Sequence, residues 1–124
     1  MAVTHPTAIR NGIANHVVDQ IDTGGAGSIE FQTSGSAVIA TLAFSATAFG
    51  AAASGIATAA SITDDTDCEP GTVAKFVVKN GSAATIFEGT VTATGGAGDI
   101  VLSSVAIGDG DTISISSLTY EAPN

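Results

Sequence analysis

The stretch from Val73 to Ala93, VAKFVVKNGSAATIFEGTVTA, constrains the fold of this chain more than any other. Apolar and polar residues alternate on both sides of the dipeptide Asn80-Gly81, as they do in half-buried strands. Asparagine and glycine tolerate positive φ, so the chain can reverse direction at this dipeptide without strain. The stretch therefore predicts an antiparallel β-hairpin.

The length of the hairpin loop decides which residues face each other across the two strands. A two-residue loop would place Phe76 opposite Thr85. A four-residue loop, Asn80 to Ala83, would instead place Phe76 opposite Phe87. The same loop would pair Lys75 with Glu88 and Val77 with Ile86. Because cross-strand pairs of these kinds contribute roughly 0.2–1 kcal/mol each, we expect the four-residue loop.

The segment from Pro6 to Asp22 carries the clearest helical pattern, since its apolar residues recur every four positions. We expect an amphipathic helix over residues 6–22, preceded by an extended arm over residues 1–5. Thr4 or His5 would cap the helix, and Pro6 suits its first turn. Gly24-Gly25 would end it. The apolar stripe consists of Ile9, Ile13, Val17 and Ile21.

After the helix, short runs rich in β-forming residues alternate with glycine-rich turns. Besides the hairpin, these runs are SIEFQT, SAVIATLAFSA, GIATAASI, IVLSSVAI and TISISSLTY. The alanine-rich run GIATAASI could also be helical, but its threonine and glycine favour a strand. This spacing is typical of sandwiches and barrels. We expect a mainly β fold, an antiparallel β-sandwich or jelly-roll-like barrel over residues 28–120, with one N-terminal amphipathic helix in a single domain spanning residues 1–124.

Twelve acidic residues against three basic ones give the chain a formal net charge of -9. Such a chain repels polyanions and has too few cations to neutralise a phosphate backbone, so we expect no direct binding to nucleic acid. Cys68 is the only cysteine, which excludes an intrachain disulfide and a multi-cysteine metal site. We expect neither an export signal nor a membrane span, because polar residues break every long apolar run.

Four carboxylates fall within six residues of the acidic loop, Thr63 to Gly71. They belong to Asp64, Asp65, Asp67 and Glu69. Carboxylate oxygens suit Ca²⁺, but the loop lacks the glycine and the glutamate that an EF-hand has at its sixth and twelfth positions. We expect a solvated acidic loop, with a calcium site as the alternative.

The sequence contains no pattern of catalytic residues: neither GxSxG nor a phosphate-binding glycine motif occurs. His5 and His16 have no further ligand at metal-binding spacing. Cys68 lies among carboxylates, which would raise the pKa of its thiol and make it a poor nucleophile. We expect no catalytic residue, no cofactor and no resident metal. Arg10 and Tyr120 are candidate interface residues, because both types are favoured in binding hot spots.

Four stretches together resemble small proteins encoded among the virion structural genes of tailed bacteriophages. They are MAVTHPTAIRNGIANHVVDQID, TVAKFVVKNGS, TATGGAGDIVLSS and GDTISISSLTYEAP, which cover nearly the whole chain. Some small β-rich proteins of this kind resemble head decoration, or cement, proteins. The resemblance implies a non-enzymatic virion structural protein, and it carries over no active-site residue.

A decoration protein of this kind would bind the outside of a phage head and stabilise the shell. The implied partners are the major capsid protein of the same phage and further copies of this chain, on the capsid surface of a virion assembled in the host cytoplasm. The N-terminal arm and helix, or an exposed sheet edge, would bridge capsid subunits. Candidate contacts are Ile9, Arg10, Ile13, Val17 and Tyr120. A tail tube or tail-tip component is one alternative. An extracellular carbohydrate-binding or adhesion module is another, although the chain has no Trp and one Tyr for a sugar platform.

Overall fold

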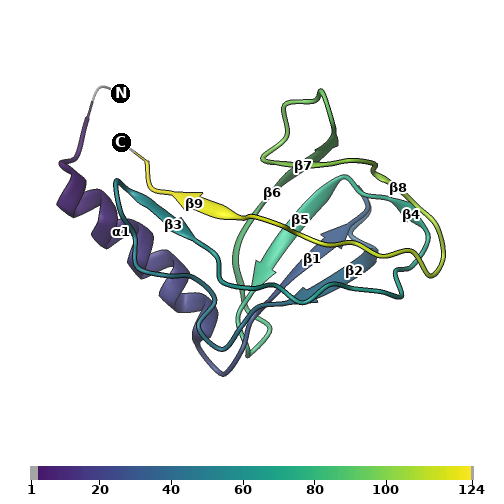
Figure 1. The fold of residues 1–124 in the computed structure, drawn as a ribbon, viewed down its shortest axis with the longest axis horizontal. Coiled ribbons are helices and arrows are strands. Elements are labelled where there is room, and N and C mark those ends of the chain that lie inside the picture. Colours follow the sequence, from purple (N-terminus) through teal and green to yellow (C-terminus); the bar gives the residue numbers. More distant parts are fainter. Residues whose placement is uncertain (1–2, 124) are drawn as a thin grey trace.

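The computed structural model describes residues 3–123, which form one α-helix followed by nine strands (Figure 1). The helix α1 spans Thr7–Asp19 and continues as a 3-10 turn over Gln20–Asp22. The strands are β1 (Ser28–Gln32), β2 (Val38–Ala43), β3 (Ile56–Thr58), β4 (Gly71–Thr72), β5 (Lys75–Lys79), β6 (Thr85–Ala93), β7 (Ile100–Leu102), β8 (Ala106–Ile107) and β9 (Thr119–Glu121). The prediction of a mainly β fold with one N-terminal helix is confirmed.

Five strands form a curled sheet in the order β2-β1-β5-β6-β7 (Figure 1). Side chains along a strand alternate between the two faces of the sheet, so every second residue points to the core. In β1 these residues are Ile29 and Phe31, both fully buried. Ile29 lies between Leu42 and Val78, and Phe31 lies opposite Phe76. These apolar rows give the sheet its core face.

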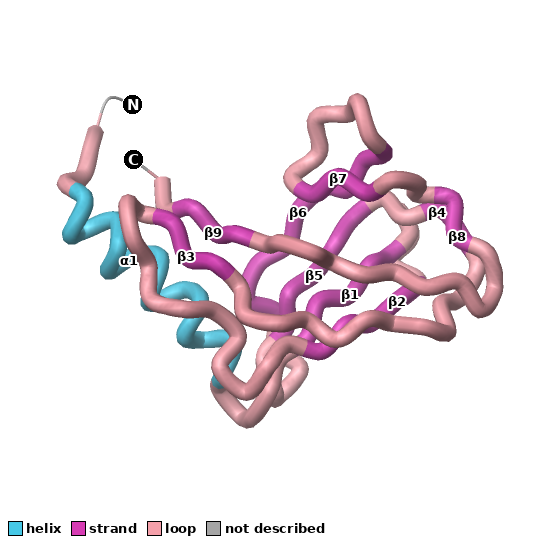
Figure 2. Tube along the Cα trace, in the orientation of Figure 1, coloured by secondary structure: helices cyan, strands magenta, loops and turns pink. Residues whose placement is uncertain are grey.

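A second, less regular layer crosses the sheet (Figures 1 and 2). In this layer β3 pairs antiparallel with β9, and the same two chain segments meet again where Asp65 pairs with Ile113. The amide of Cys68 then donates to the carbonyl of Asp111. The layer is therefore one long antiparallel pair of chain segments whose middle part is unpaired. Ile113 of this layer belongs to the same core cluster as the sheet residues.

The pairing of β6 with β7 is parallel, which corrects the expectation of a purely antiparallel sheet. A parallel pair normally needs a long crossover, but here the chain returns through the glycine-rich loop 94–99. Gly96 and Gly98 lie against Thr92, where an added Cβ would come within 2.5 to 3.0 Å of its side chain. The small loop residues therefore let the chain fold back tightly along the edge of β6.

The β5–β6 hairpin is confirmed, but the predicted register is wrong. Val78 pairs with Phe87, and the pairing shifts by one residue near the loop. Phe76 lies opposite Gly89 and meets the ring of Phe87 diagonally, at 6.2 Å between centroids. The predicted pairs Lys75 with Glu88 and Val77 with Ile86 are replaced by Lys75 with Thr90 and Val77 with Glu88.

The loop of this hairpin explains the error. Positive φ occurs at Ala83, with φ 65°, and not at Asn80 or Gly81. The side chain of Asn80 accepts hydrogen bonds from the amides of Ser82 and Ala84, and the loop contains the five residues between Lys79 and Thr85, one more than predicted. Gly81 is required for another reason: an added Cβ would lie 2.6 Å from the backbone of Gly24.

The helix starts one residue later than predicted. Pro6 is the N-cap, with an extended ψ of 158°, and no side chain caps the helix, so neither Thr4 nor His5 has the expected role. The helix ends before Gly24 and Gly25, which both have positive φ, as expected. The third predicted strand shrinks to the three residues of β3, and its buried residue is Ala57.

Candidate functional site

Polar side chains dock α1 onto the loop that precedes β3. The side-chain oxygens of Asn11 and Asn15 accept hydrogen bonds from the amides of Gly55, at 2.7 Å, and Ala52, at 2.8 Å. Asp22 accepts one from the amide of Ala48 at 2.9 Å. We call Asn11, Asn15 and Asp22 the polar clamp. It satisfies loop amides that have no strand to pair with.

The spacing of the polar clamp is that of one helix face. Asn11, Asn15, Val18 and Asp22 stand at positions i, i+4, i+7 and i+11. Val18 and Ala14 are buried on this face, so the side of the helix that packs inward carries asparagines as well as small apolar residues. The apolar stripe predicted from the sequence does not include Asn11 or Asn15. Their i, i+4 spacing was the available signal.

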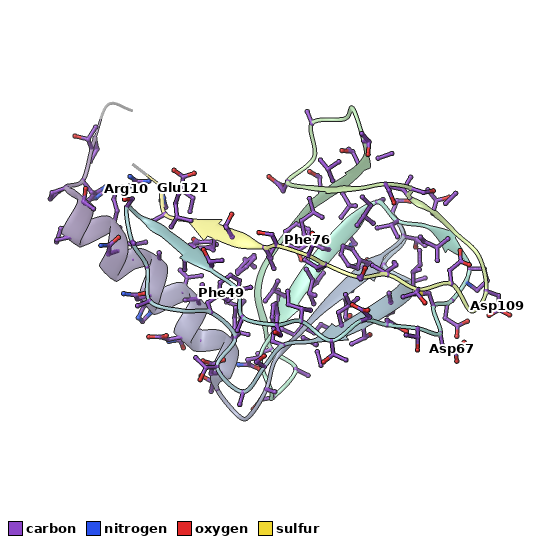
Figure 3. The ribbon with its side chains drawn as sticks, viewed as in Figure 1. Arg10, Phe49, Asp67, Phe76, Asp109 and Glu121 are labelled. Atoms are coloured by element: carbon purple, nitrogen blue, oxygen red, sulfur yellow. The ribbon has the colours of Figure 1, made fainter. Side chains whose placement is uncertain are left out.

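Arg10 ties α1 to the last strand. Its guanidinium lies 3.1 Å from the carboxylate of Glu121 and donates to the carbonyl of Ala122 at 3.2 Å (Figure 3). The side chain of Arg10 is only 16% exposed and lies against Gly55, where an added Cβ would come within 2.6 Å of the guanidinium carbon. This candidate interface residue is therefore engaged within the fold.

The apolar stripe of the helix lies at the border of the docked face. Ile21 is fully buried, but Ile13 and Val17 are only half-buried, and Ile9 is 51% exposed. Val3, in the arm before the helix, is 55% exposed. We call Val3, Ile9, Ile13 and Val17 the outer stripe. Because the polar clamp and Arg10 help to hold the helix, Val3 and Ile9 can face the solvent, while Ile13 packs partly against the core.

Tyr120 of β9 is half-buried and reaches across to β6, where its ring lies 5.2 Å from that of Phe87. Phe76 packs against the other side of Phe87. A hollow of about 450 Å³ opens beside these three rings, lined by Phe76, Phe87, Glu88, Asp99, Ile100, Leu118, Thr119, Tyr120 and Glu121. We call this hollow the β6–β9 slot. It places Tyr120 in the wall of a surface depression.

The acidic loop uses one of its carboxylates to cover the edge of β2. Asp65 accepts hydrogen bonds from the amides of Thr41, at 2.9 Å, and Asp67, at 3.0 Å. The side chains of Asp64, Asp67 and Glu69 are exposed. Within residues 3–123 no group of three or more His, Cys, Asp or Glu side chains is arranged to hold a metal, and this includes His5 and His16. The geometry therefore gives the calcium alternative no support.

Cys68 is fully buried beneath this loop, and its thiol lies 3.6 Å from the carbonyl of Asp65. Burial raises the pKa of the thiol, and the nearby carboxylate of Asp65 raises it further. A buried thiol with a raised pKa is a poor nucleophile. Cys68 therefore has a structural place in the core.

Searches of protein-family models, of curated proteins and of solved structures found no match to this chain. In the part of the chain that the structure describes, no helix is both long enough and apolar enough to cross a membrane.

Proposed function

We propose that this chain is a non-enzymatic virion structural protein that decorates the outside of a tailed-phage head and stabilises the shell. The outer stripe is the observation that carries the proposal. An apolar residue that is half exposed on a helix held by other contacts is available to a partner, and apolar surface gains about 25 cal/mol per Å² when it leaves water. The resemblance of the sequence to phage structural proteins supports the same choice.

The arrangement of the helix fits docking on a larger assembly. The polar clamp and Arg10 hold α1 rigidly, so its outer stripe can meet a shell without the protein unfolding. Many copies on a repeating shell would each need only a small contact, because avidity multiplies weak interfaces. The net charge of -9 keeps free copies apart before assembly.

Co-sedimentation with empty, undecorated shells of the phage that carries the gene would test this proposal. We expect saturable binding at a fixed copy number per shell, counted by electron microscopy. The double variant Val3→Ser/Ile9→Ser should stay folded and bind at least about tenfold more weakly, since each exposed apolar contact contributes roughly 1 kcal/mol.

The matched control is Val38→Ser, which removes a 43% exposed valine from β2. This control should bind as the parent does. If Val38→Ser and the double variant lose binding equally, the outer stripe is not the contact. If the protein does not bind shells and forms rings or tubes, it is a tail component. Capture on a glycan array would favour a carbohydrate-binding module.

A further inference from the structure

The β6–β9 slot lies between two strand edges that both have unpaired backbone groups. On β6, the amide of Val91 donates to Ala74 next to β5, so alternation turns the N–H and C=O groups of Thr90 and Glu88 to the opposite edge. The amide of Thr90 is taken by the carboxylate of Asp99 at 3.0 Å. Within the described residues the backbone of Glu88 has no partner on this edge.

The other wall of the slot is β9. Leu118 and Ala122 turn their backbone groups toward the β3 side, where Leu118 accepts from Ala59 and Ala122 donates to Gly55. Alternation then directs the backbone groups of Thr119 and Glu121 away from β3. Among residues 3–123 neither of these two has a backbone partner on that side.

The residues that line the slot indicate which kind of ligand it would bind. Its lining includes the aromatic residues Phe76, Phe87 and Tyr120 and the acidic residues Glu88, Asp99 and Glu121, and no lysine or arginine. Lys79 pairs with Glu30 and Lys75 donates to Ser36, both away from the slot, whereas Arg10 pairs with Glu121 of the slot lining and leaves Glu88 and Asp99 without a cationic partner. A lining that is both aromatic and acidic suits lysine or arginine side chains, whose stems pack on rings while their charges meet carboxylates.

We propose that the β6–β9 slot binds an extended, basic segment of a partner polypeptide as an added strand. The segment would hydrogen-bond to Glu88 on one side and to Thr119 and Glu121 on the other, joining the β3–β9 pair to the main sheet. A second copy of this chain is the poorer occupant, because it brings a net charge of -9 to an acidic lining. This site is separate from the outer stripe and does not depend on the head-decoration proposal.

A synthetic peptide would test the slot. The probe is the acetylated and amidated heptapeptide Lys-Val-Lys-Val-Lys-Val-Lys, titrated into the ¹⁵N-labelled full chain and followed by NMR. We expect the amide signals of Glu88, Thr119 and Glu121 to shift and their hydrogen exchange to slow. The same peptide with glutamate in place of lysine should bind at least about tenfold more weakly.

Two further comparisons separate strand addition from charge alone. Methylating the valine nitrogens of the peptide keeps its charge but removes the backbone donors along one of its two edges, and should weaken binding about tenfold. Glu88→Gln should weaken binding about two- to fivefold, since exposed ion pairs are modest. Glu69→Gln, the same change of charge on the acidic loop, should change the affinity less than about twofold.

The proposal is overturned if the glutamate and N-methyl peptides bind as well as the lysine peptide, or if the shifts fall outside the slot. Equal losses in Glu88→Gln and Glu69→Gln would also overturn it, because they indicate attraction to the whole acidic surface. If the slot amides shift with protein concentration in the absence of peptide, the occupant is a second copy and the assignment to a basic partner fails.

Discussion

The main sheet and the helix are held in the same molecule by different combinations of contacts. In the sheet, Phe31 and its neighbours on β2 and β5 are buried side by side, and apolar contact fixes their positions. The helix is held by its buried residues Ala14 and Val18 and also by Asn11, Asn15 and Arg10, through hydrogen bonds and an ion pair. Because polar groups dock the helix, its apolar residues need not all face inward. The comparison shows how a small protein can keep an apolar surface free while remaining folded.

The largest effect is expected in the sheet. Phe31→Ala removes a fully buried ring from the centre of the core and should lower the free energy of unfolding by about 3–5 kcal/mol, because the cavity cannot fully close. Urea unfolding followed by circular dichroism measures this. Val38→Ala, at an exposed position of β2, is the control and should cost less than about 1 kcal/mol. A loss below 1 kcal/mol for Phe31→Ala would show that apolar packing does not dominate the sheet.

The next effect tests the polar clamp. Asn15→Leu should cost about 1–3 kcal/mol, because it leaves the amide of Ala52 without its acceptor although it adds apolar surface. Asn15→Asp keeps an acceptor oxygen in the same place and should cost about 0.5 kcal/mol or less. Chemical denaturation compares the two. If the leucine variant is as stable as the parent, the helix is docked by apolar contact as the sheet is.

A smaller effect concerns the hairpin loop. Ala83→Gly should raise the free energy of unfolding by about 0.5–1 kcal/mol, because glycine adopts the positive φ of this position without strain. Gly81→Ala should lower it, since the new Cβ would collide with the backbone of Gly24. Thermal unfolding of both variants is the measurement. If Ala83→Gly lowers the free energy of unfolding and Gly81→Ala raises it, the positive φ lies at Asn80-Gly81 and not at Ala83.

The smallest effect is a dependence on pH. The amide of Thr90 donates to the carboxylate of Asp99, and this holds the pKa of Asp99 below its ordinary value of 3.8. The folded state therefore favours the charged form, so the stabilisation is fully present above about pH 3.8 and is lost as the pH falls through the lower, folded value. Melting temperatures between pH 6 and pH 3 should fall less for Asp99→Asn than for the parent. If the melting temperatures of Asp99→Asn and the parent fall equally with pH, the charged form of Asp99 does not stabilise the fold.

The sequence predicts the sheet better than the helix docking for a physical reason. Alternation of apolar residues reports which side of a strand is buried, so the core faces of β1, β5 and β6 follow from residues such as Ile29 and Val78. The register depends on the geometry of the loop. Asn80-Gly81 suggests a turn at that dipeptide, and the sequence carries no signal that Ala83 adopts the positive φ instead. Predicting the polar clamp requires knowing that loop amides lie opposite Asn11 and Asn15, and this depends on the tertiary structure. The β6–β9 slot likewise depends on two edges far apart in sequence.

The pairing of Arg10 with Glu121 also sets the order in which the chain can fold. The two residues are 111 positions apart, so their contact closes nearly the whole chain, and such non-local closure makes folding slow. A helix can form within about a microsecond of being released, long before its anchoring strand exists during synthesis. Asn11 and Asn15 can dock the helix on the loop before β3 earlier, but the contact of Arg10 with Glu121 forms only after β9 has been synthesised.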